Sequence, residues 1–169
     1  STVREDLYRR DFTINAMAFS LREKKLLDPF GGARDLRARK IKAVGDPRER
    51  FLEDLSRMLR AVRFACELNF RTEKQTLAAM RELSPRLNGK REDGSWIVAR
   101  ELLASEIAKA LFADAKKCLD LMNEADILSH IFPWVSVRAT KTRLKKIRSN
   151  AALSLSILFY DLPLEKAAT

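Results

Sequence analysis

Two of four charged residues in the middle of the chain, Asp54 and Arg57, have the types and spacing to present a hydrogen-bond acceptor beside a group of donors. Glu53, Asp54, Arg57 and Arg60 lie in the stretch 50–70, which reads RFLEDLSRMLRAVRFACELNF. Its apolar spacing predicts one continuous helix, on which residues three apart are neighbours. Asp54 would then present an acceptor beside the donors of Arg57, an order that matches cytosine and adenine and is reversed in guanine and uracil. From spacing alone, a salt bridge between Asp54 and Arg57 within the helix is the simpler interpretation.

A second polar group lies near the start of the chain, where Arg10, Asp11, Thr13 and Asn15 occur within six residues. The apolar spacing predicts a helix over residues 5–19. An arginine can grip phosphate with two hydrogen bonds, and an aspartate can accept one from a ribose hydroxyl. On composition alone, these residues fit an ion-paired surface helix better.

Basic residues dominate the later part of the chain. The formal charge is +10 and the isoelectric point is about 9.9, which favours a polyanionic partner, with nucleic acid as the leading candidate. No acidic residue lies between Asp126 and Asp161. A predicted helix whose charges are all positive is explained better by contact with RNA or DNA phosphates than by exposure to solvent, because solvated charged helices normally carry both signs. Its basic residues are Arg138, Lys141, Arg143, Lys145, Lys146 and Arg148.

Several other classes of protein are disfavoured. Cys66 and Cys118 fall within helical patterns and are expected to be buried thiols in a reducing compartment. The single His130 has no Cys or His at ligand spacing, which argues against a zinc site and favours a structural role. The sequence shows no signal peptide and no run of roughly 20 apolar residues, so we expect a cytoplasmic protein without a membrane partner.

The remaining patterns predict a mainly helical chain. Asp46 and Pro47 provide a cap and a first position for the central helix. Gly31 and Gly32 indicate a turn or hinge rather than a phosphate-binding loop, because the complete glycine-rich frames are missing. Other expected elements are an extended piece at 25–27, a brief helix from 33 to 40 followed by extended residues 41–44, and helices at 72–83 with Thr72 as N-cap, 98–112, 115–125 and 127–134.

Three long motifs occur in order in the first half of the chain. They read RRDFTINAMAF, DPFGGARDL and VGDPRERFLEDLSRMLRAVRFA. In sequence and spacing they resemble the class II tRNA nucleotidyltransferases, that is, the CCA-adding enzymes and their CC- and A-adding relatives. These enzymes share a head domain with bacterial poly(A) polymerases. The similarity is dense from Glu5 to about Thr76 and looser as far as Trp134.

The resemblance implies roles for the first polar group and for the DPFGGARDL segment. Arg10 would bind the triphosphate and Asp11 the ribose hydroxyl, with Thr13 and Asn15 in support. The DPFGGARDL segment would be the flexible joint of the nucleotide-binding head, which agrees with the hinge interpretation of its two glycines.

For the central group, the resemblance implies a template made of amino acids. Asp54 and Arg57 would read the base, Glu53 would hold Arg57 in place, and Arg60 would help to bind the nucleotide. These implied roles favour base selection by Asp54 and Arg57 over a simple salt bridge between them.

The implied fold is mainly α, with the C-terminal remnant of an α/β nucleotidyltransferase head followed by an all-helical neck and body. Residues 1–46 would form the head remnant, residues 47–113 the neck that recognises the base, and residues 114–169 the body that binds tRNA.

The implied activity is the addition of C and/or A to the 3′ end of tRNA from CTP and ATP, with Mg²⁺ and release of pyrophosphate. The carboxylates that hold the metal occur in a DxD motif, which this chain lacks. We expect them upstream of Ser1, in the N-terminal part of the head, on the same or a separate chain. No catalytic or metal-binding residue is therefore assigned here, and the segment alone is expected to be inactive.

Two alternatives stay open at this point. One is a bacterial poly(A) polymerase, although such enzymes usually carry REDPVR where this chain has LEDLSR. The other is a non-catalytic helical module that binds RNA and keeps the head motifs as a scaffold.

Overall fold

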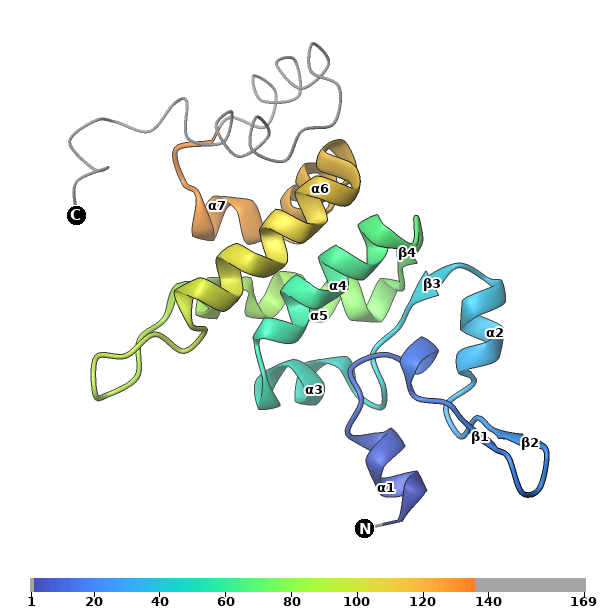
Figure 1. Ribbon diagram of the computed structural model, residues 1–169. Helices are drawn as coiled ribbons and strands as arrows, with labels where there is room; N and C mark the ends of the chain where they lie inside the picture. Colours follow the sequence, from blue (N-terminus) through green and yellow to red (C-terminus); the bar gives the residue numbers. More distant parts are fainter. Residues whose placement is uncertain (1, 136–169) are drawn as a thin grey trace.

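The structure is a computed structural model that describes residues 2–135. In chain order its elements are α1 (Val3–Tyr8), the 3₁₀ helix η1 (Thr13–Asn15), β1 (Ala18–Ser20), β2 (Lys25–Leu27), α2 (Gly32–Arg37), β3 (Lys40–Ile41), α3 (Pro47–Glu53), α4 (Ser56–Glu67), β4 (Arg71–Thr72), α5 (Lys74–Leu83), the 3₁₀ helix η2 (Ser84–Asn88), α6 (Arg100–Glu124) and α7 (Ile127–Ile131). The fold is mainly α, as expected (Figure 1).

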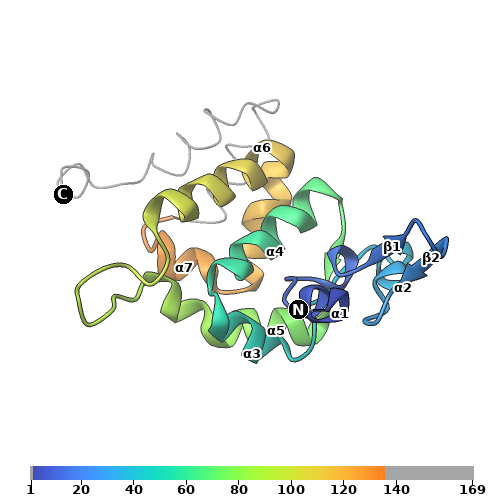
Figure 2. The same cartoon turned by 60° about the horizontal axis from the view of Figure 1, so that its bottom comes forward.

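The helices from α3 onward pack around one core. The long α6 lies along α4, α3 packs on α5, and α7 packs on both η2 and α6 (Figures 1 and 2). Met58, Leu59, Met80 and Leu119 are among the fully buried side chains of this core. Arg63 of α4 donates a 2.7 Å hydrogen bond to the buried Glu106 of α6, which ties the two helices together across their polar edge.

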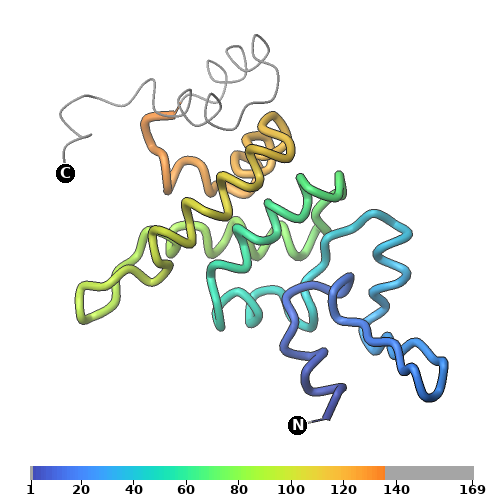
Figure 3. The backbone as a smooth tube through the Cα atoms, viewed as in Figure 1, coloured from blue at the N-terminus to red at the C-terminus, as the bar shows by residue number. Residues whose placement is uncertain are grey.

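The N-terminal elements lie to one side of these helices. The antiparallel β1–β2 hairpin projects from the rest of the chain, and α2 stands between it and the short parallel pair β3–β4 (Figures 1 and 2). The backbone trace passes from the blue elements up to β3 into α3, and the orange α7 is the last described helix (Figure 3). Phe12 joins the two parts, because it is fully buried and its ring meets that of Phe64 on α4 edge-on at 5.7 Å.

The helix predicted over residues 5–19 is wrong. The first helix ends at Tyr8, and Phe12 forms an antiparallel bridge with Ala43. On either side, the N–H of Thr13 donates to the carbonyl of Lys42 at 2.9 Å, and Asp11 accepts from a distant backbone N–H. Hydrogen bonds to residues 42–44 therefore replace the helical ones, and apolar spacing alone cannot reveal such partners.

Other predicted elements are confirmed at nearby boundaries. Lys25–Leu27 is a strand, and α3 begins with Pro47 behind the Asp46 cap, whose Oδ1 accepts from Glu49 N–H at 2.9 Å. The two helices expected at 98–112 and 115–125 are the two halves of α6, which is kinked at Asp114, where φ is −158° and ψ is 94°.

Both cysteines are buried and free, as expected. The Cys118 thiol donates to Met122 Sδ at 3.7 Å, and the influence of the neighbouring Cys66 thiol together with burial raises the pKa of Cys118. Thiols of this kind stay protonated and unreactive. Among residues 2–135, no helix is long and apolar enough to cross a membrane.

The start of α5 differs by one residue from the predicted start. Thr72 belongs to β4, and Glu73 is the N-cap, because its Oε2 accepts from the Thr76 N–H at 2.9 Å. We expect Glu73→Ala to lower the free energy of unfolding at neutral pH by about 1 kcal/mol, since it removes this cap. Urea unfolding measures the loss, and Glu73→Gln, which keeps an acceptor, should lose less.

The Glu73 cap also predicts a dependence on pH. Burial disfavours the ionised carboxylate, but hydrogen bonds from Thr76 and Gln75 and the charge of Lys42 together outweigh burial and lower the pKa of Glu73 below its ordinary 4.5. Such a group stabilises the fold above its unfolded pKa, and this contribution is lost as pH falls through the lower folded pKa. Below pH 4.5, unfolding free energy should therefore fall more steeply in the wild type than in Glu73→Gln. Equal slopes would contradict this role of the ionised cap.

Candidate functional site

The site lies where α3 gives way to α4, beside the extended residues that follow α1. Asp54 breaks the helix predicted over residues 50–70, which is therefore wrong: α3 ends at Glu53, Asp54 is extended with φ −154° and ψ 101°, and α4 begins at Ser56. The break is stabilised locally, because Asp54 Oδ1 accepts from the N–H of Ser56 at 2.9 Å and from its hydroxyl at 2.6 Å. Aspartate favours such turns over helix interiors.

Asp54 and Arg57 do not form the ion pair with each other that spacing suggested. Instead, Asp54 Oδ2 lies 2.6 Å from Arg60 Nη2, and Arg57 Nη1 lies 2.6 Å from Glu53 Oε2. The Asp54 carboxylate and the Arg57 guanidinium therefore each have a different partner.

Asp11 connects the two arginines of α4. Its Oδ1 lies 2.9 Å from Arg57 Nε and its Oδ2 lies 3.4 Å from Arg60 Nη1. The Asp11 and Arg57 side chains are only 14% and 13% exposed, which makes this contact less screened than a surface pair. Among the described residues, the buried Nε–H groups of both arginines have no hydrogen-bond acceptor, so the Asp11–Arg57 contact is an ion pair without an aligned N–H.

Arg50, which sequence analysis used only to mark the start of a helix, belongs to the same cluster. Its Nη1 donates to Glu53 Oε2 at 2.8 Å, and its backbone carbonyl accepts from Arg57 Nη1 at 2.8 Å. Positive and negative groups thus alternate from Arg50 through Glu53, Arg57, Asp11 and Arg60 to Asp54.

Thr13 and Asn15 shape the turn that carries Asp11. The Thr13 hydroxyl donates to Asp35 Oδ2 at 2.9 Å in a buried contact, and Asn15 Oδ1 accepts from the Phe12 N–H at 3.1 Å. Asp35, in the DPFGGARDL motif, is a further residue of the site that the sequence analysis did not single out. The motif offered the only sequence signal for it.

The two glycines of that motif differ in their surroundings. Gly31 has a positive φ of 75° and is the N-cap of α2, whereas Gly32, the first residue of the helix, packs directly against the backbone of Thr13. A Cβ at Gly32 would lie 2.0 Å from the Thr13 carbonyl oxygen. Close packing of α2 on η1 therefore requires a glycine there, in addition to the hinge role expected from the sequence.

Arg10 stands apart from this cluster. Its Nη2 pairs with Asp6 at 2.9 Å, and both side chains are more than half exposed. The basic residues predicted to bind RNA lie outside the described residues; they are Arg138, Lys141, Arg143, Lys145, Lys146 and Arg148.

The site does not fit a catalytic metal. Over residues 2–135, no group of three or more His, Cys, Asp or Glu side chains is arranged to hold a metal ion. The carboxylates of Asp11 and Asp54 are both occupied by arginines. The arrangement suits hydrogen bonding to a polar ligand instead.

Comparisons with known proteins show what the chain resembles in sequence and in fold. Residues 1–42 match the family of the poly A polymerase head domain. A CCA-adding enzyme of Bacillus licheniformis is 46% identical to the chain over 145 residues. The resemblance to the tRNA nucleotidyltransferases is confirmed. This alignment covers 81% of the chain but 36% of the CCA-adding enzyme, so the chain spans about a third of that relative.

Solved structures extend the similarity to the fold. A tRNA-processing enzyme with CTP superimposes with a TM-score of 0.77 at 31% identity, over 99% of this chain and 49% of that chain. The Thermotoga maritima CCA-adding enzyme complexed with tRNA gives a TM-score of 0.75 at 27% identity, over 99% and 43% of the two chains. The expected fold class is therefore confirmed by CCA-adding enzymes and their structural relatives.

Proposed function

We propose that this chain forms the nucleotide-selecting and RNA-holding part of an enzyme that adds C and/or A to the 3′ end of tRNA, using CTP and ATP and no nucleic-acid template. The observation that carries the proposal is the single ion-pair cluster that unites Asp11, Asp54 and Arg57. It is supported by the similarity to a CCA-adding enzyme with tRNA and to a tRNA-processing enzyme with CTP.

Because Asp54 and Arg57 are not paired with each other, each of them can form a hydrogen bond with the base. Within residues 2–135, Arg57 Nη2 donates a long hydrogen bond of 3.5 Å to the carbonyl of Arg9, so this nitrogen can donate to a ring nitrogen of the base. A carboxylate oxygen accepts more than one hydrogen bond, so Asp54 can accept from an exocyclic amino group while it still holds Arg60. Cytosine and adenine present this amino donor and ring acceptor, whereas guanine and uracil present the reverse order.

The remaining residues of the cluster position the rest of the nucleotide. Asp11 would accept from a ribose hydroxyl, and Arg60 would assist at the same place, so sugar and base would be read by one connected network. Thr13 and Asn15 would support this turn. Arg10, which is exposed, would leave Asp6 and bind the triphosphate, because a phosphate is the stronger partner for a guanidinium.

The parts of the chain would divide this work as the sequence predicts. Residues 1–46 would complete the head, residues 47–113 would form the neck, and residues 114–169 would form the tRNA-binding body. The kink of α6 at Asp114 coincides with the second boundary and supports it. The basic residues between 138 and 148 would contact tRNA phosphates.

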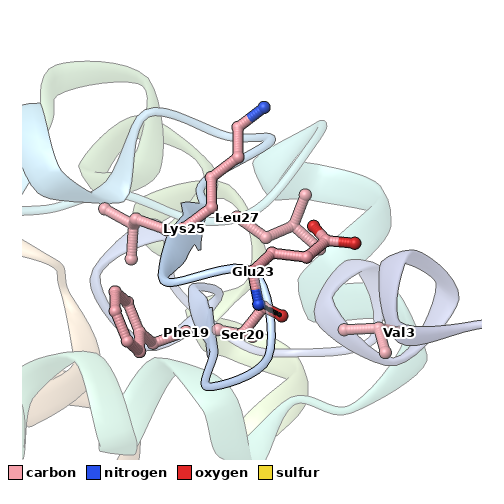
Figure 4. A pocket seen from close by; sticks show the side chains of 8 residues that line it. Val3, Phe19, Ser20, Glu23, Lys25 and Leu27 are labelled. Atoms are coloured by element: carbon pink, nitrogen blue, oxygen red, sulfur yellow. Dashed lines mark hydrogen bonds between the residues drawn. The ribbon is translucent and has the colours of Figure 1, made fainter.

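The exposed apolar surface of the β1–β2 hairpin favours an additional partner, the N-terminal part of the head. Phe19 and Leu26 are 57% and 47% exposed, and Val3 of α1 borders the same hollow of about 380 Å³ (Figure 4). A two-stranded sheet is marginal alone, and exposed apolar patches commonly mark an interface. We propose that the rest of the head covers this surface, on the same or a separate chain.

Transfer of the nucleotide requires groups beyond this cluster. The 3′ hydroxyl oxygen of the RNA would form a bond to the α-phosphorus while pyrophosphate leaves. We propose that the carboxylates for Mg²⁺ come from the N-terminal part of the head, and that this segment alone does not catalyse the step. The two free thiols suit a reducing compartment, which supports a cytoplasmic location.

A nucleotide-addition assay tests the proposal. The substrate is a tRNA that lacks its 3′ CCA, and the chain is supplied alone or joined to a head that contains the metal-binding carboxylates. We expect C or A to be added only by the joined protein. Robust addition by the chain alone would contradict the proposed division of the active site, and no addition by a folded joined protein would contradict the proposed function.

The rival activity of a poly(A) polymerase is tested in the same system. With ATP alone and an RNA that has no tRNA fold, a polymerase would extend the RNA by many residues. We expect no such extension.

A further inference from the structure

Arg50 is a buried cation to which the proposed reaction assigns no role. The residue is only 3% exposed, and its Nε donates to the carbonyl of Val44 at 3.2 Å. The ring of Tyr8 lies 4.8 Å from its guanidinium carbon, so α1 contributes an aromatic face to this group. Burial of a guanidinium is costly unless it is paired. A neutral donor would satisfy Val44, so the charge requires another explanation.

Glu53 provides that explanation, because one of its oxygens serves two arginines. Its Oε2 accepts from Arg50 Nη1 at 2.8 Å and from Arg57 Nη1 at 2.6 Å. The Glu53 side chain is 51% exposed, so packing alone would leave it free to move into solvent. The hydrogen bond from the buried Arg50 therefore fixes the oxygen on which Arg57 rests.

Arg50 holds Arg57 in a second way. The carbonyl of Arg50 accepts from the same Arg57 Nη1 at 2.8 Å. Both Arg50 and Glu53 thus engage Nη1, which leaves Nη2 as the donor that can face a ligand. A small rotation of the guanidinium would move Nη2 away from the place where a base could meet Asp54.

We propose that Arg50 is a positioning residue for base selection, which orients Arg57 through Glu53 and is itself supported by the aromatic ring of Tyr8. The positioning of Arg57 stands on the contacts above. Its consequence for base selection rests on the proposed function.

The positioning is tested in the 169-residue chain without any nucleotide. Nitrogen-15 NMR follows solvent exchange of the Arg57 Nε–H, which is buried in the wild type. We expect Arg50→Met to accelerate this exchange at least tenfold and Arg50→Lys to accelerate it less. Unchanged exchange in a folded Arg50→Met would overturn the proposal.

Two further variants keep the test decisive. Arg48→Met is the matched control, because Arg48 lies on the same helix and pairs at 2.6 Å with Glu82 on the surface; it should leave Arg57 unchanged. If Arg50→Met fails to fold, Glu53→Gln interrupts the same connection at an exposed position, and it should accelerate Arg57 exchange in the same way. Wild-type exchange in Glu53→Gln would overturn the proposal.

Calorimetry with CTP and UTP tests the consequence for selection. We expect the preference for CTP to fall about tenfold in Arg50→Met, with part of it restored in Arg50→Lys, because displacement of a donor by about 1 Å is costly. A wild-type preference in a variant with accelerated Arg57 exchange would overturn the link to selection. If the wild type itself shows no preference, the proposed function fails, while NMR still decides whether Arg50 positions Arg57.

Discussion

Arg57→Ala is expected to reduce the preference for CTP and ATP over GTP and UTP by about 10- to 150-fold. A hydrogen bond to a charged group contributes about 1.5–3 kcal/mol, and this variant removes the donor that would discriminate between the bases. It also removes a partner of Asp11 and Glu53, so nucleotide affinity should fall as well. The measurement is kcat/KM for each nucleotide, with the chain joined to a catalytic head.

Arg86→Ala serves as the control for this prediction, because Arg86 is an exposed arginine on η2, far along the chain from the cluster. It should leave the four kcat/KM values in their wild-type ratios. If Arg57→Ala also kept these ratios, Arg57 would be a structural ion-pair partner and not a reader of the base.

Gly32→Ala is expected to destabilise the fold by about 3 kcal/mol, at the upper end of the cost of overpacking. The new methyl group would lie 2.0 Å from the Thr13 carbonyl oxygen, and because this atom is backbone, α2 and η1 must separate. Separation would also break the Thr13–Asp35 hydrogen bond and shift the turn that carries Asp11. Urea unfolding measures the stability, and nucleotide binding should weaken in parallel.

Gly31→Ala is the matched control next to it. Its cost should be about 1–2 kcal/mol, which is the penalty of a left-handed backbone for a residue with a Cβ, because the nearest atoms belong to the flexible Arg34 side chain. A larger loss for Gly31→Ala than for Gly32→Ala would contradict the importance of close packing at Gly32.

Sequence reasoning located the members of the site but not their geometry. The motifs brought attention to Asp11, Glu53, Asp54, Arg57 and Arg60, which the structure gathers into one cluster. Their roles in nucleotide binding remain proposals. The partners themselves could not be predicted, because the three-residue spacing assumed an unbroken helix.

The break at Asp54 is invisible to apolar periodicity. The stripe of apolar residues continues on both sides of it, and the helix is interrupted by local hydrogen bonds from Ser56 to the Asp54 side chain. The continuous helix predicted over residues 5–19 likewise misses the pairing of the Thr13 N–H with the Lys42 carbonyl at the start of the short 3₁₀ helix η1. The burial of Arg50 and its contact with Tyr8, which is distant in sequence, could not be predicted from apolar spacing.

Regular helices were more predictable. The amphipathic spacing predicted both halves of α6, and Asp46 with Pro47 predicted the start of α3. These signals depend only on neighbours within one or two helical turns. The predicted N-cap of α5, Thr72, lies one residue before the actual one. Threonine is a common N-cap residue, but Glu73 caps this helix.

The most direct test of base selection uses nucleotides that lack only the amino group. We would compare CTP with the triphosphate of its analogue without the exocyclic amine, for the wild type and for Asp54→Ala, both joined to a catalytic head. The wild type should use the analogue about 10- to 150-fold less well than CTP, because Asp54 then loses its donor, and Asp54→Ala should use both equally. A wild type that uses the analogue as well as CTP would contradict selection by Asp54.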